Sequence, residues 1–201
     1  MNDKEFYEKH KNFACRRPSE YHLSPGIKCK FDILKDQLGE NRNFSLGIDL
    51  GCSGNSFLYF YESVKVKSFL DLARLPLIHY ASGSYWHPAC GDLTRLPYRN
   101  NTFDFISALD VLEHLKEDDL AITEMTRICR NGGIIVITVP HRMKYYSLQD
   151  EIIGHHRRYE ISGLKNKFER HGIRTLKTFG VYGQIMRIAD VQAKSPEKTE
   201  T

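Results

Sequence analysis

Aspartates stand at the ends of four short apolar runs, where their carboxylates could bind a polar ligand. The four are Asp49 in "GIDLG", Asp71 in "FLDLA", Asp92 in "CGDL" and Asp110 in "SALDV". A carboxylate accepts hydrogen bonds from hydroxyl and amino groups and attracts positive charge. Asp71 follows Asp49 by 22 residues, a spacing that suits hydrogen bonds to ribose hydroxyls. Asp71 could equally cap the next helix, and Asp92 could be an ordinary turn aspartate.

Two glycines, Gly51 and Gly54, follow Asp49 in a turn that precedes a helical pattern. Glycine lets the backbone approach a ligand closely, and a helix N-terminus favours an anion. Asp49 would repel a pyrophosphate, however, whereas it would attract an ammonium group. Asp92 could accept a hydrogen bond from an exocyclic amine of a base that lies beside Leu93. A ribose, an amino-bearing base and a positive charge without phosphate describe S-adenosylmethionine better than NAD.

Alternating strands and helices would bring these aspartates together. Apolar runs predict strands at 45–50, 66–72, 86–93, 103–109 and 133–139. Helical patterns occupy 27–38, 55–64, 117–130, which "NGG" should end, and 161–172, with Ser162 and Gly172 as caps. Segments 173–179 and 182–191 could form a final hairpin. The alternation predicts a parallel α/β sheet, which binds ligands at the carboxyl ends of its strands.

Five segments, in order, resemble the class I S-adenosylmethionine-dependent methyltransferases over roughly two-thirds of the chain. They are "GIDLGCSGNS", "FLDLA", "CGDLTRLPYRNNTFDFISALDVLEHL", "EMTRICRNGGIIVITVPH" and "GHHRRYEISGLKNKFERHGI". The resemblance implies a Rossmann-like three-layer α/β/α sandwich, with a mostly parallel seven-stranded sheet and a C-terminal antiparallel hairpin. The glycine turn departs from the family's G-x-G-x-G, since Ser53 and Asn55 stand at two of the glycine positions. Asn55 tolerates left-handed backbone, and Ser53 can still donate a hydrogen bond to a carboxylate.

The resemblance implies a binding site for S-adenosylmethionine, with S-adenosylhomocysteine as the product. Its residues here are Asp49, Gly51, Ser53, Gly54, Asp71, Leu72, Asp92, Leu93, Leu109 and Asp110. By resemblance, Asp49 faces the methionine ammonium, Asp71 binds the ribose and Asp92 accepts from the adenine amine. The implied chemistry is methyl transfer by direct displacement, which requires in-line alignment and exclusion of water.

Histidines near the ends of the predicted strands are candidates for a general base on the acceptor side. His141 and His155 are the favoured catalytic residues, and His114 and His156 are further candidates. Packing or capping is the more common role of such histidines. No metal site is expected, because only His155 and His156 are close in sequence and adjacent residues rarely ligate one ion.

Basic and aromatic residues flank the predicted site. Arg157 and Arg158 would suit an acidic small-molecule acceptor. Equally, one of these arginines could pair with Asp110 or Glu113 and hold a lid. Tyr21, in the N-terminal segment, is either a lid residue or a packing residue.

Composition narrows the class of protein. Of 201 residues, 41% are hydrophobic and 27% charged, which fits a globular protein, and a net charge of +4 gives no strong nucleic-acid signal. Five cysteines without a C-x-x-C pair argue against a disulfide framework and favour a cytoplasmic location. No signal peptide or membrane span is expected. We expect an N-terminal helical cap at 1–43, a cofactor-binding methyltransferase domain at 44–192 and a polar tail at 193–201.

Several functions stay open at this point. The favoured one is methyl transfer to a small-molecule or lipid-like acceptor. RNA or protein methylation and a non-catalytic S-adenosylmethionine-binding module are alternatives. An NAD-dependent oxidoreductase is disfavoured by Asp49 and by the missing G-x-G-x-x-G. The sequence does not indicate an oligomeric state.

Overall fold

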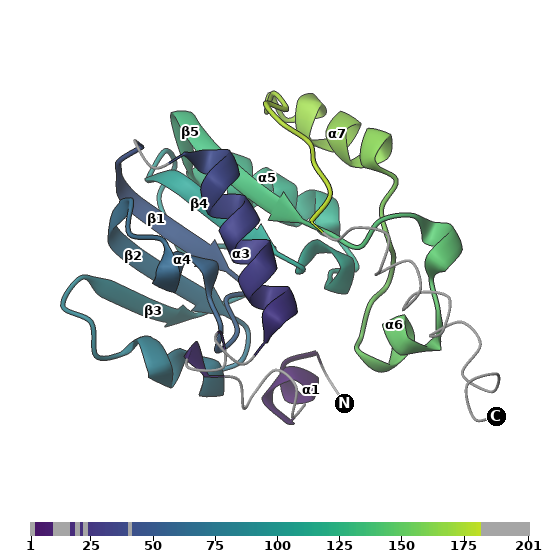
Figure 1. The fold of residues 1–201 in the computed structure, drawn as a ribbon, viewed down its shortest axis with the longest axis horizontal. Coiled ribbons are helices and arrows are strands. Elements are labelled where there is room, and N and C mark those ends of the chain that lie inside the picture. The colour runs from purple at the N-terminus through teal and green to yellow at the C-terminus, as the bar shows by residue number, and fades with distance from the viewer. Residues whose placement is uncertain (1–2, 10–16, 19–20, 22–23, 40–41, 182–201) are drawn as a thin grey trace.

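The computed structural model describes residues 3–9, 17–18, 21, 24–39 and 42–181, and a five-stranded sheet lies at its centre (Figure 1). The strands are β1 (Phe44–Leu50), β2 (Val64–Asp71), β3 (Trp86–Cys90), β4 (Phe103–Leu109) and β5 (Cys129–Thr138). Their order is β3-β2-β1-β4-β5, and every neighbouring pair is parallel. The chain extends the sheet in one direction from β1 and then in the other. In such sheets ligands bind where these directions diverge, here at the carboxyl ends of β1 and β4.

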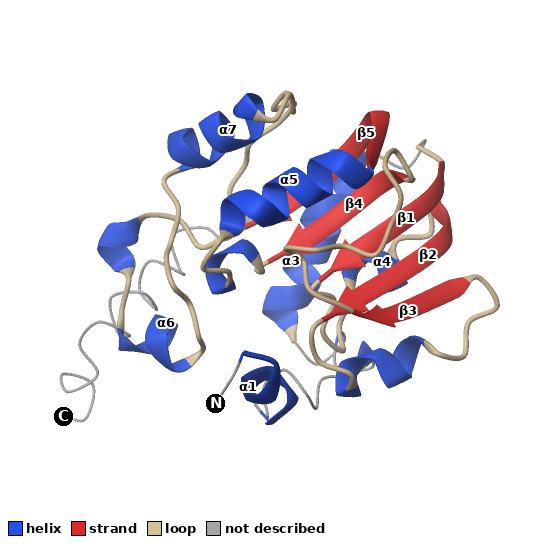
Figure 2. Cartoon of the chain, turned by 180° about the vertical axis from the view of Figure 1, so that it is seen from behind, coloured by secondary structure: helices blue, strands red, loops and turns tan. Residues whose placement is uncertain are grey.

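Helices cover both faces of the sheet. The α-helices are α1 (Asp3–Lys9), α3 (Pro25–Leu38), α4 (Phe57–Phe60), α5 (Asp118–Ile128), α6 (Leu148–Ile152) and α7 (Ile161–Arg170). The 3₁₀-helices whose full span lies in the described residues are η2 (Leu75–Tyr80), η3 (Leu112–His114) and η4 (Met143–Tyr145). Helices α3 and α4 lie on one face, and α5 and α7 lie on the other (Figures 1 and 2). Both views place α1 and α6 beyond the carboxyl ends of the strands, which is the side of the expected ligand site.

Alternate residues of the central strands separate into two buried clusters. Ile48 and Ile106 belong to the cluster that includes Met125 of α5. Phe69 and Phe105 belong to an aromatic cluster with residues of α3 and α4. All five side chains are fully buried, and each such burial stabilises the fold by roughly 1.5–3 kcal/mol. The period-two alternation of the strands therefore holds the site between two packed layers.

The N-terminal segment packs on the aromatic cluster. Tyr21 is buried and stacks on Phe60 with ring centroids 4.1 Å apart. Its hydroxyl donates to Asp32 Oδ1 at 3.0 Å. The structure thus places Tyr21 as a packing residue beside α3 and α4. The boundaries expected for the cap, the domain and the tail stay predictions.

The predicted helices begin or end at other residues in the structure. The helix predicted over 55–64 is the four-residue α4, because the aromatic residues here pack in several directions and β2 already begins at Val64. Helix α7 has Glu160 as its N-cap, so the prediction of Ser162 is wrong. The chain before Glu160 is held extended by an isolated bridge between Tyr159 and the segment after β5, and this lets the helix begin at once.

The helix predicted over 117–130 ends two residues early, at Ile128. Cys129 leaves the helix because it pairs with Phe103 of β4, and a register shift follows in that strand pair. The "NGG" segment therefore lies inside β5, so its prediction as a helix C-cap is wrong.

The seven-stranded sheet and its final antiparallel hairpin are not confirmed. The described part of the chain has the five parallel strands given above. Segment 173–179 forms no strand, and 182–191 lies outside the described residues.

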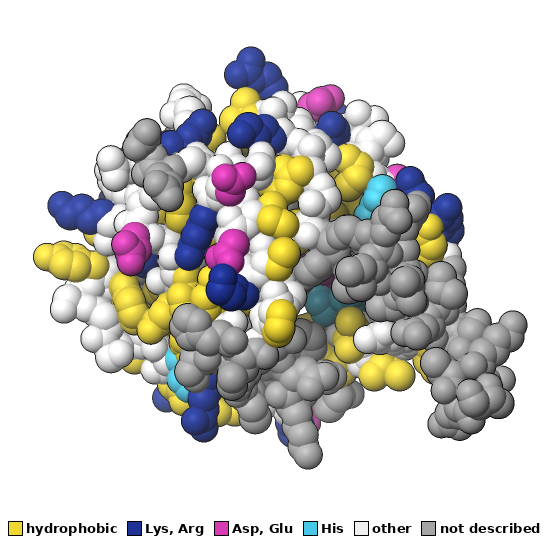
Figure 3. Space-filling model, in the orientation of Figure 1, with side chains coloured by type: hydrophobic (Ala, Val, Ile, Leu, Met, Phe, Trp, Pro, Cys, Tyr) yellow, Lys and Arg dark blue, Asp and Glu magenta, His cyan; other side chains and the backbone are white. Residues whose placement is uncertain are grey.

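Charges of both signs are interspersed on the face that carries α3 (Figure 3). Within the described residues, no helix is both long and apolar enough to cross a membrane.

Candidate active site

The turn after β1 contains left-handed backbone at Gly51 and Ser53, with φ of 68° and 48°. A Cβ atom on Gly51 would lie 2.4 Å from Val111 Cγ2, so both conformation and space require glycine there. Ser53 adopts this region although it carries a side chain, which is uncommon. The left-handed substitute for a family glycine is thus Ser53 rather than Asn55.

Asp49 is the buried centre of this turn, with 3% of its surface exposed. Its Oδ1 accepts a hydrogen bond from Ser107 Oγ at 2.6 Å, and its Oδ2 accepts one from Ser56 Oγ. Burial raises the pKa of Asp49 to about 6, although the serine hydrogen bonds act in the opposite direction. Asp49 therefore connects β1 to β4 and to the start of α4. Its contact with an ammonium group stays a prediction.

Asp71, at the end of β2, orients the glycine turn from the neighbouring strand. Its Oδ2 accepts from the Ser53 backbone N–H and its Oδ1 from that of Ala73, each at 2.8 Å. Burial raises the pKa of Asp71 above its ordinary value. Asp71 is not the N-cap of η2, which is Arg74. Because each carboxylate oxygen can accept two hydrogen bonds, these contacts leave acceptor capacity for a ligand hydroxyl.

Asp92 occupies an exposed turn after β3. Its Oδ1 accepts from both the backbone N–H and the hydroxyl of Thr94 at 2.8 Å, so it has the turn role that the sequence left open. The next residue, Leu93, is buried at 5% exposure. An acid beside an apolar side chain at a strand end remains compatible with the predicted adenine site.

One cavity of about 1520 Å³ joins most of the predicted cofactor residues. Nine of the ten line it: Asp49, Gly51, Ser53, Asp71, Leu72, Asp92, Leu93, Leu109 and Asp110. Gly54 is buried in the turn and is not among the lining residues. The cavity continues along apolar residues of β5 and reaches His141 and His155.

Asn55 also lines this cavity, in a role that sequence reasoning missed. Its side chain is 9% exposed, and neither its amide nitrogen nor its oxygen has a hydrogen-bond partner among the described residues. A buried polar group without a partner costs about 1–3 kcal/mol. A polar ligand in the cavity would remove that cost. The available signal was the amide side chain within the glycine turn.

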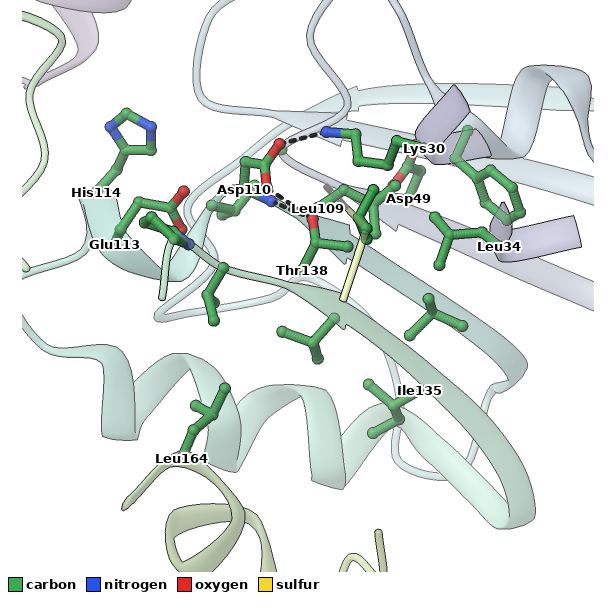
Figure 4. Close-up of a pocket in the computed structure, with 18 of the residues that line it drawn as sticks. Lys30, Leu34, Asp49, Leu109, Asp110, Glu113, His114, Ile135, Thr138 and Leu164 are labelled. Carbon is green, nitrogen blue, oxygen red and sulfur yellow. Dashed lines mark hydrogen bonds and ion pairs between the residues drawn. The ribbon is translucent and has the colours of Figure 1, made fainter. Parts of the chain in front are cut away.

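Asp110 lies at the end of β4, facing α3 (Figure 4). Its carboxylate forms an ion pair with Lys30 and accepts from Thr138 Oγ1 at 2.7 Å. Desolvation opposes ionisation, but the Lys30 charge and these hydrogen bonds outweigh it and lower the pKa of Asp110. The N-terminal segment is thereby connected to the cavity wall through Lys30, which is 7% exposed.

The part of the cavity beyond Asp110 contains Glu113, His114 and His155. Figure 4 shows the Glu113 carboxylate between His114 and Asp110. Glu113 is 1% exposed, and burial raises its pKa well above the usual range, an effect to which the Asp110 charge adds. Burial lowers the pKa of His114 to about 4. The pKa of His155 is lowered too, since burial outweighs the adjacent Asp150 carboxylate.

His141 and His155 have different surroundings, although both line the cavity. His141 is exposed, and its Nε2 lies 3.9 Å from Glu160 Oε2. His155 is largely buried, and its Nδ1 lies 2.8 Å from Asp150 Oδ1. A base held by a carboxylate is the usual arrangement for proton transfer, so the geometry favours His155 over His141 as a catalytic candidate.

The two arginines bind carboxylates of this chain. Arg157 lies 2.9 Å from Asp118 Oδ1, and Arg158 lies 2.9 Å from Asp150 Oδ1. Their predicted partners, Asp110 and Glu113, are therefore wrong. Asp110 already pairs with Lys30, and Glu113 faces the histidines.

Residues 48–137 match a family model described as a methyltransferase domain. The match spans the glycine turn and the aspartates at the ends of β2 and β4. This part of the chain is similar to a methyltransferase domain, and the fold around it is that of the class I S-adenosylmethionine-dependent methyltransferases.

A curated relative of this chain is the uncharacterized protein MJ0638 of Methanocaldococcus jannaschii. It is 24% identical over 143 residues, which are 71% of this chain and 61% of the relative. The chain thus spans less than two thirds of that protein's length.

Three solved structures share the fold. The methyltransferase in complex with the Haloferax volcanii Trm112 activator has a TM-score of 0.69 and 15% identity, over 85% of this chain and 77% of that one. NodS from Bradyrhizobium japonicum, an N-methyltransferase solved with S-adenosylhomocysteine, has a TM-score of 0.64 and 16% identity, over 82% of this chain and 84% of that one. Phosphoethanolamine N-methyltransferase 2 from Haemonchus contortus, solved with S-adenosylmethionine, has a TM-score of 0.71 and 13% identity, over 99% of this chain and 51% of that one.

The solved relatives NodS and phosphoethanolamine N-methyltransferase 2 contain S-adenosylhomocysteine and S-adenosylmethionine, respectively, and the cavity can be compared with the chemistry of S-adenosylmethionine. The residues present fit it chemically: carboxylates at the ends of β1 and β2 suit an ammonium and a ribose, and the amide of Asn55 lacks a partner among the described residues. The side chains that stand at two of the family's glycine positions, Ser53 and Asn55, line the cavity and do not fill it.

Proposed function

We propose that this protein transfers a methyl group from S-adenosylmethionine to a small-molecule or lipid-like acceptor by direct displacement. The observation that carries the proposal is the continuity of the cavity. It joins the residues at the ends of β1, β2 and β3 to the apolar residues of β5 and to His155. Donor and acceptor can thus occupy one space.

When bound, the donor supplies an activated methyl group on a sulfonium. The residues of this chain have to orient both reactants and exclude water. Asp71 and Asn55 are placed to bind polar groups of the donor, and the apolar wall of β5 to bind the acceptor. If the acceptor must lose a proton, His155 is the base we propose, because Asp150 holds its ring at 2.8 Å.

The acceptor class rests on the lining of the cavity. Ile135 and Ile137 of β5 line it, as does Val139 just after this strand, together with Leu164 and Phe168 of α7. Such a wall suits an acceptor with an apolar portion. The structural relatives that methylate amines, NodS and the phosphoethanolamine enzyme, agree with a small acceptor. Both are under 25% identical to this chain.

RNA or protein methylation is the alternative. The interspersed charges on the face in Figure 3 do not form a continuous basic surface of the kind that binds nucleic acid. A protein partner keeps some support, because the Haloferax volcanii relative was solved with its Trm112 activator.

The test begins with calorimetric titration of the full chain with S-adenosylhomocysteine, with NAD in parallel. We expect saturable binding of the first alone. Asp71→Asn should weaken it by tenfold or more, since a hydrogen bond to a charged group is worth about 1.5–3 kcal/mol. Asp36→Asn, an exposed acid of α3 outside the cavity, should leave binding unchanged.

Transfer of a labelled methyl group is then measured with amines, hydroxy acids and lipid headgroups, and separately with RNA and protein extracts. Labelling of RNA or protein alone would overturn the acceptor class. Donor binding without transfer to any of these acceptors would favour the non-catalytic module.

A further inference from the structure

Glu113, His114 and His155 converge at the far end of the cavity. One ligand atom from each lies within 4.8 Å of the other two. Both oxygens of the Glu113 carboxylate are buried and have no hydrogen-bond partner in the described part of the chain. In its ionised form a buried carboxylate without a hydrogen-bond partner is strongly unfavourable. A cation bound beside Glu113 would stabilise that ionised form, so the arrangement suits a positively charged ligand.

The imidazole of His155 is oriented for ligation. Its Nδ1 lies 2.8 Å from Asp150 Oδ1, and Asp150 is itself held by Arg158 at 2.9 and 3.0 Å. A carboxylate can only accept, so Nδ1 carries the proton and Nε2 has the lone pair. That Nε2 lies 3.8 Å from Glu113 Oε1. In metal-bound histidines, one ring nitrogen commonly donates its hydrogen to a carboxylate while the other binds the ion. His155 has this arrangement, with Nε2 directed at Glu113.

His114 is oriented by the backbone. Its Nδ1 lies 3.2 Å from the carbonyl oxygen of Gly154, and a carbonyl also only accepts, so Nε2 is again the basic nitrogen. The two imidazole rings meet edge to face with centroids 4.5 Å apart. The backbone N–H of His156 donates to the Glu113 carbonyl at 2.7 Å, and this fixes the distance between the two segments that carry the cluster.

The spacing is close to that of a bound ion. In a tetrahedral site with bonds of about 2.1 Å, neighbouring ligand atoms lie roughly 3.4 Å apart. The 3.8 Å between Glu113 and His155 is a few tenths of an ångström longer, a change that side-chain rotation can supply.

We propose that Glu113, His114 and His155 bind a divalent transition-metal ion of the Zn²⁺ or Co²⁺ type. Two imidazoles and one carboxylate form a donor set that suits such ions better than it suits Mg²⁺ or Ca²⁺. Three protein ligands leave a position open toward the cavity, where an oxygen or nitrogen of a second ligand can bind. The site lies one 3₁₀ turn beyond Asp110. Because an ion on His155 Nε2 occupies the lone pair that a general base needs, this proposal and the role of His155 as a base exclude each other, and metal binding is tested without methyl transfer.

The test is titration of Co²⁺ into the full chain, prepared without a histidine tag and freed of metal with a chelator. Visible absorption bands report the coordination of Co²⁺, and calorimetry reports its stoichiometry. We expect one ion per chain, displaced by Zn²⁺ and not by an equal concentration of Mg²⁺. Glu113→Gln and His155→Asn should each weaken binding by about 100-fold or more, since even second-sphere changes cost 10–100-fold.

His156→Asn is the matched control, because this histidine is the exposed neighbour of His155. It should leave Co²⁺ affinity unchanged. S-adenosylhomocysteine titration and circular dichroism of every variant report the donor site and the fold separately. Absence of a one-to-one Co²⁺ complex in the wild type would overturn the proposal. Equal Co²⁺ affinity in a folded Glu113→Gln or His155→Asn variant would overturn it as well.

Discussion

Replacing Asp49 by asparagine should change how the stability of the protein depends on pH. Burial raises the pKa of Asp49 from its ordinary 3.8 to about 6, so the folded protein disfavours the ionised form by about 3 kcal/mol. A carboxyl group whose pKa is raised in the folded state contributes stability below pH 4. That contribution is lost as the pH rises through 6. Asparagine does not titrate, so the variant should lack this loss.

The measurement is urea unfolding of wild type and Asp49→Asn at intervals from pH 4 to pH 7. We expect the variant to gain roughly 2.5 kcal/mol relative to wild type across this interval, whatever its stability at pH 4, because a small part of the loss has already occurred at pH 4. Other titrating groups are common to both proteins and largely cancel in the difference. A difference that stays constant with pH would refute the reasoning, because the carboxylate would then be as well stabilised in the fold as in water.

Other parts of the structure give further predictions. Gly51→Ala should destabilise the protein by roughly 1–3 kcal/mol, because of strain at positive φ and the clash with Val111. Gly163→Ala, in helix α7 with open space around it, should instead stabilise the protein by about 0.5–1 kcal/mol. Thermal unfolding measures both changes, and equal shifts in the midpoint would contradict the turn geometry. Lys30→Met should lower stability measurably in low salt, since it removes the partner of Asp110, while the exposed Lys28→Met should not. An equal effect of the two lysine changes in urea unfolding would show that the burial of Lys30 is unimportant.

The central strands were predictable because they are apolar runs bounded by acids and glycines. Strand β4 was predicted with its observed ends, since Phe103 to Leu109 is buried on both faces of the sheet. The end of α5 was not predictable, because the choice between helix and strand at Cys129 depends on its pairing with β4. Local propensity does not contain that information.

The gathering of the predicted cofactor residues around one cavity was largely predictable, whereas the cluster at its far end was not. Asp49 precedes the glycine turn and Asp71 ends a strand, and both features have a local signature. His114 and His155 are 41 residues apart, and their convergence on Glu113 depends on hydrogen bonds between η3 and the segment before α7. Sequence reasoning that considered only neighbouring histidines therefore predicted no metal site.

The segment between α6 and α7 is bound to two other parts of the chain at once. The N–H of His156 bonds to Glu113, that of Tyr159 to Pro140, and that of Arg142 back to Tyr159. The Tyr159 hydroxyl donates to the Leu112 carbonyl. These contacts should open and close together, so their amide hydrogens should exchange with solvent as one cooperative unit. A ligand that contacts any part of this unit would slow the exchange of all of it. Exchange protection would therefore reveal a ligand at the His141 and His155 end of the cavity before any acceptor is identified.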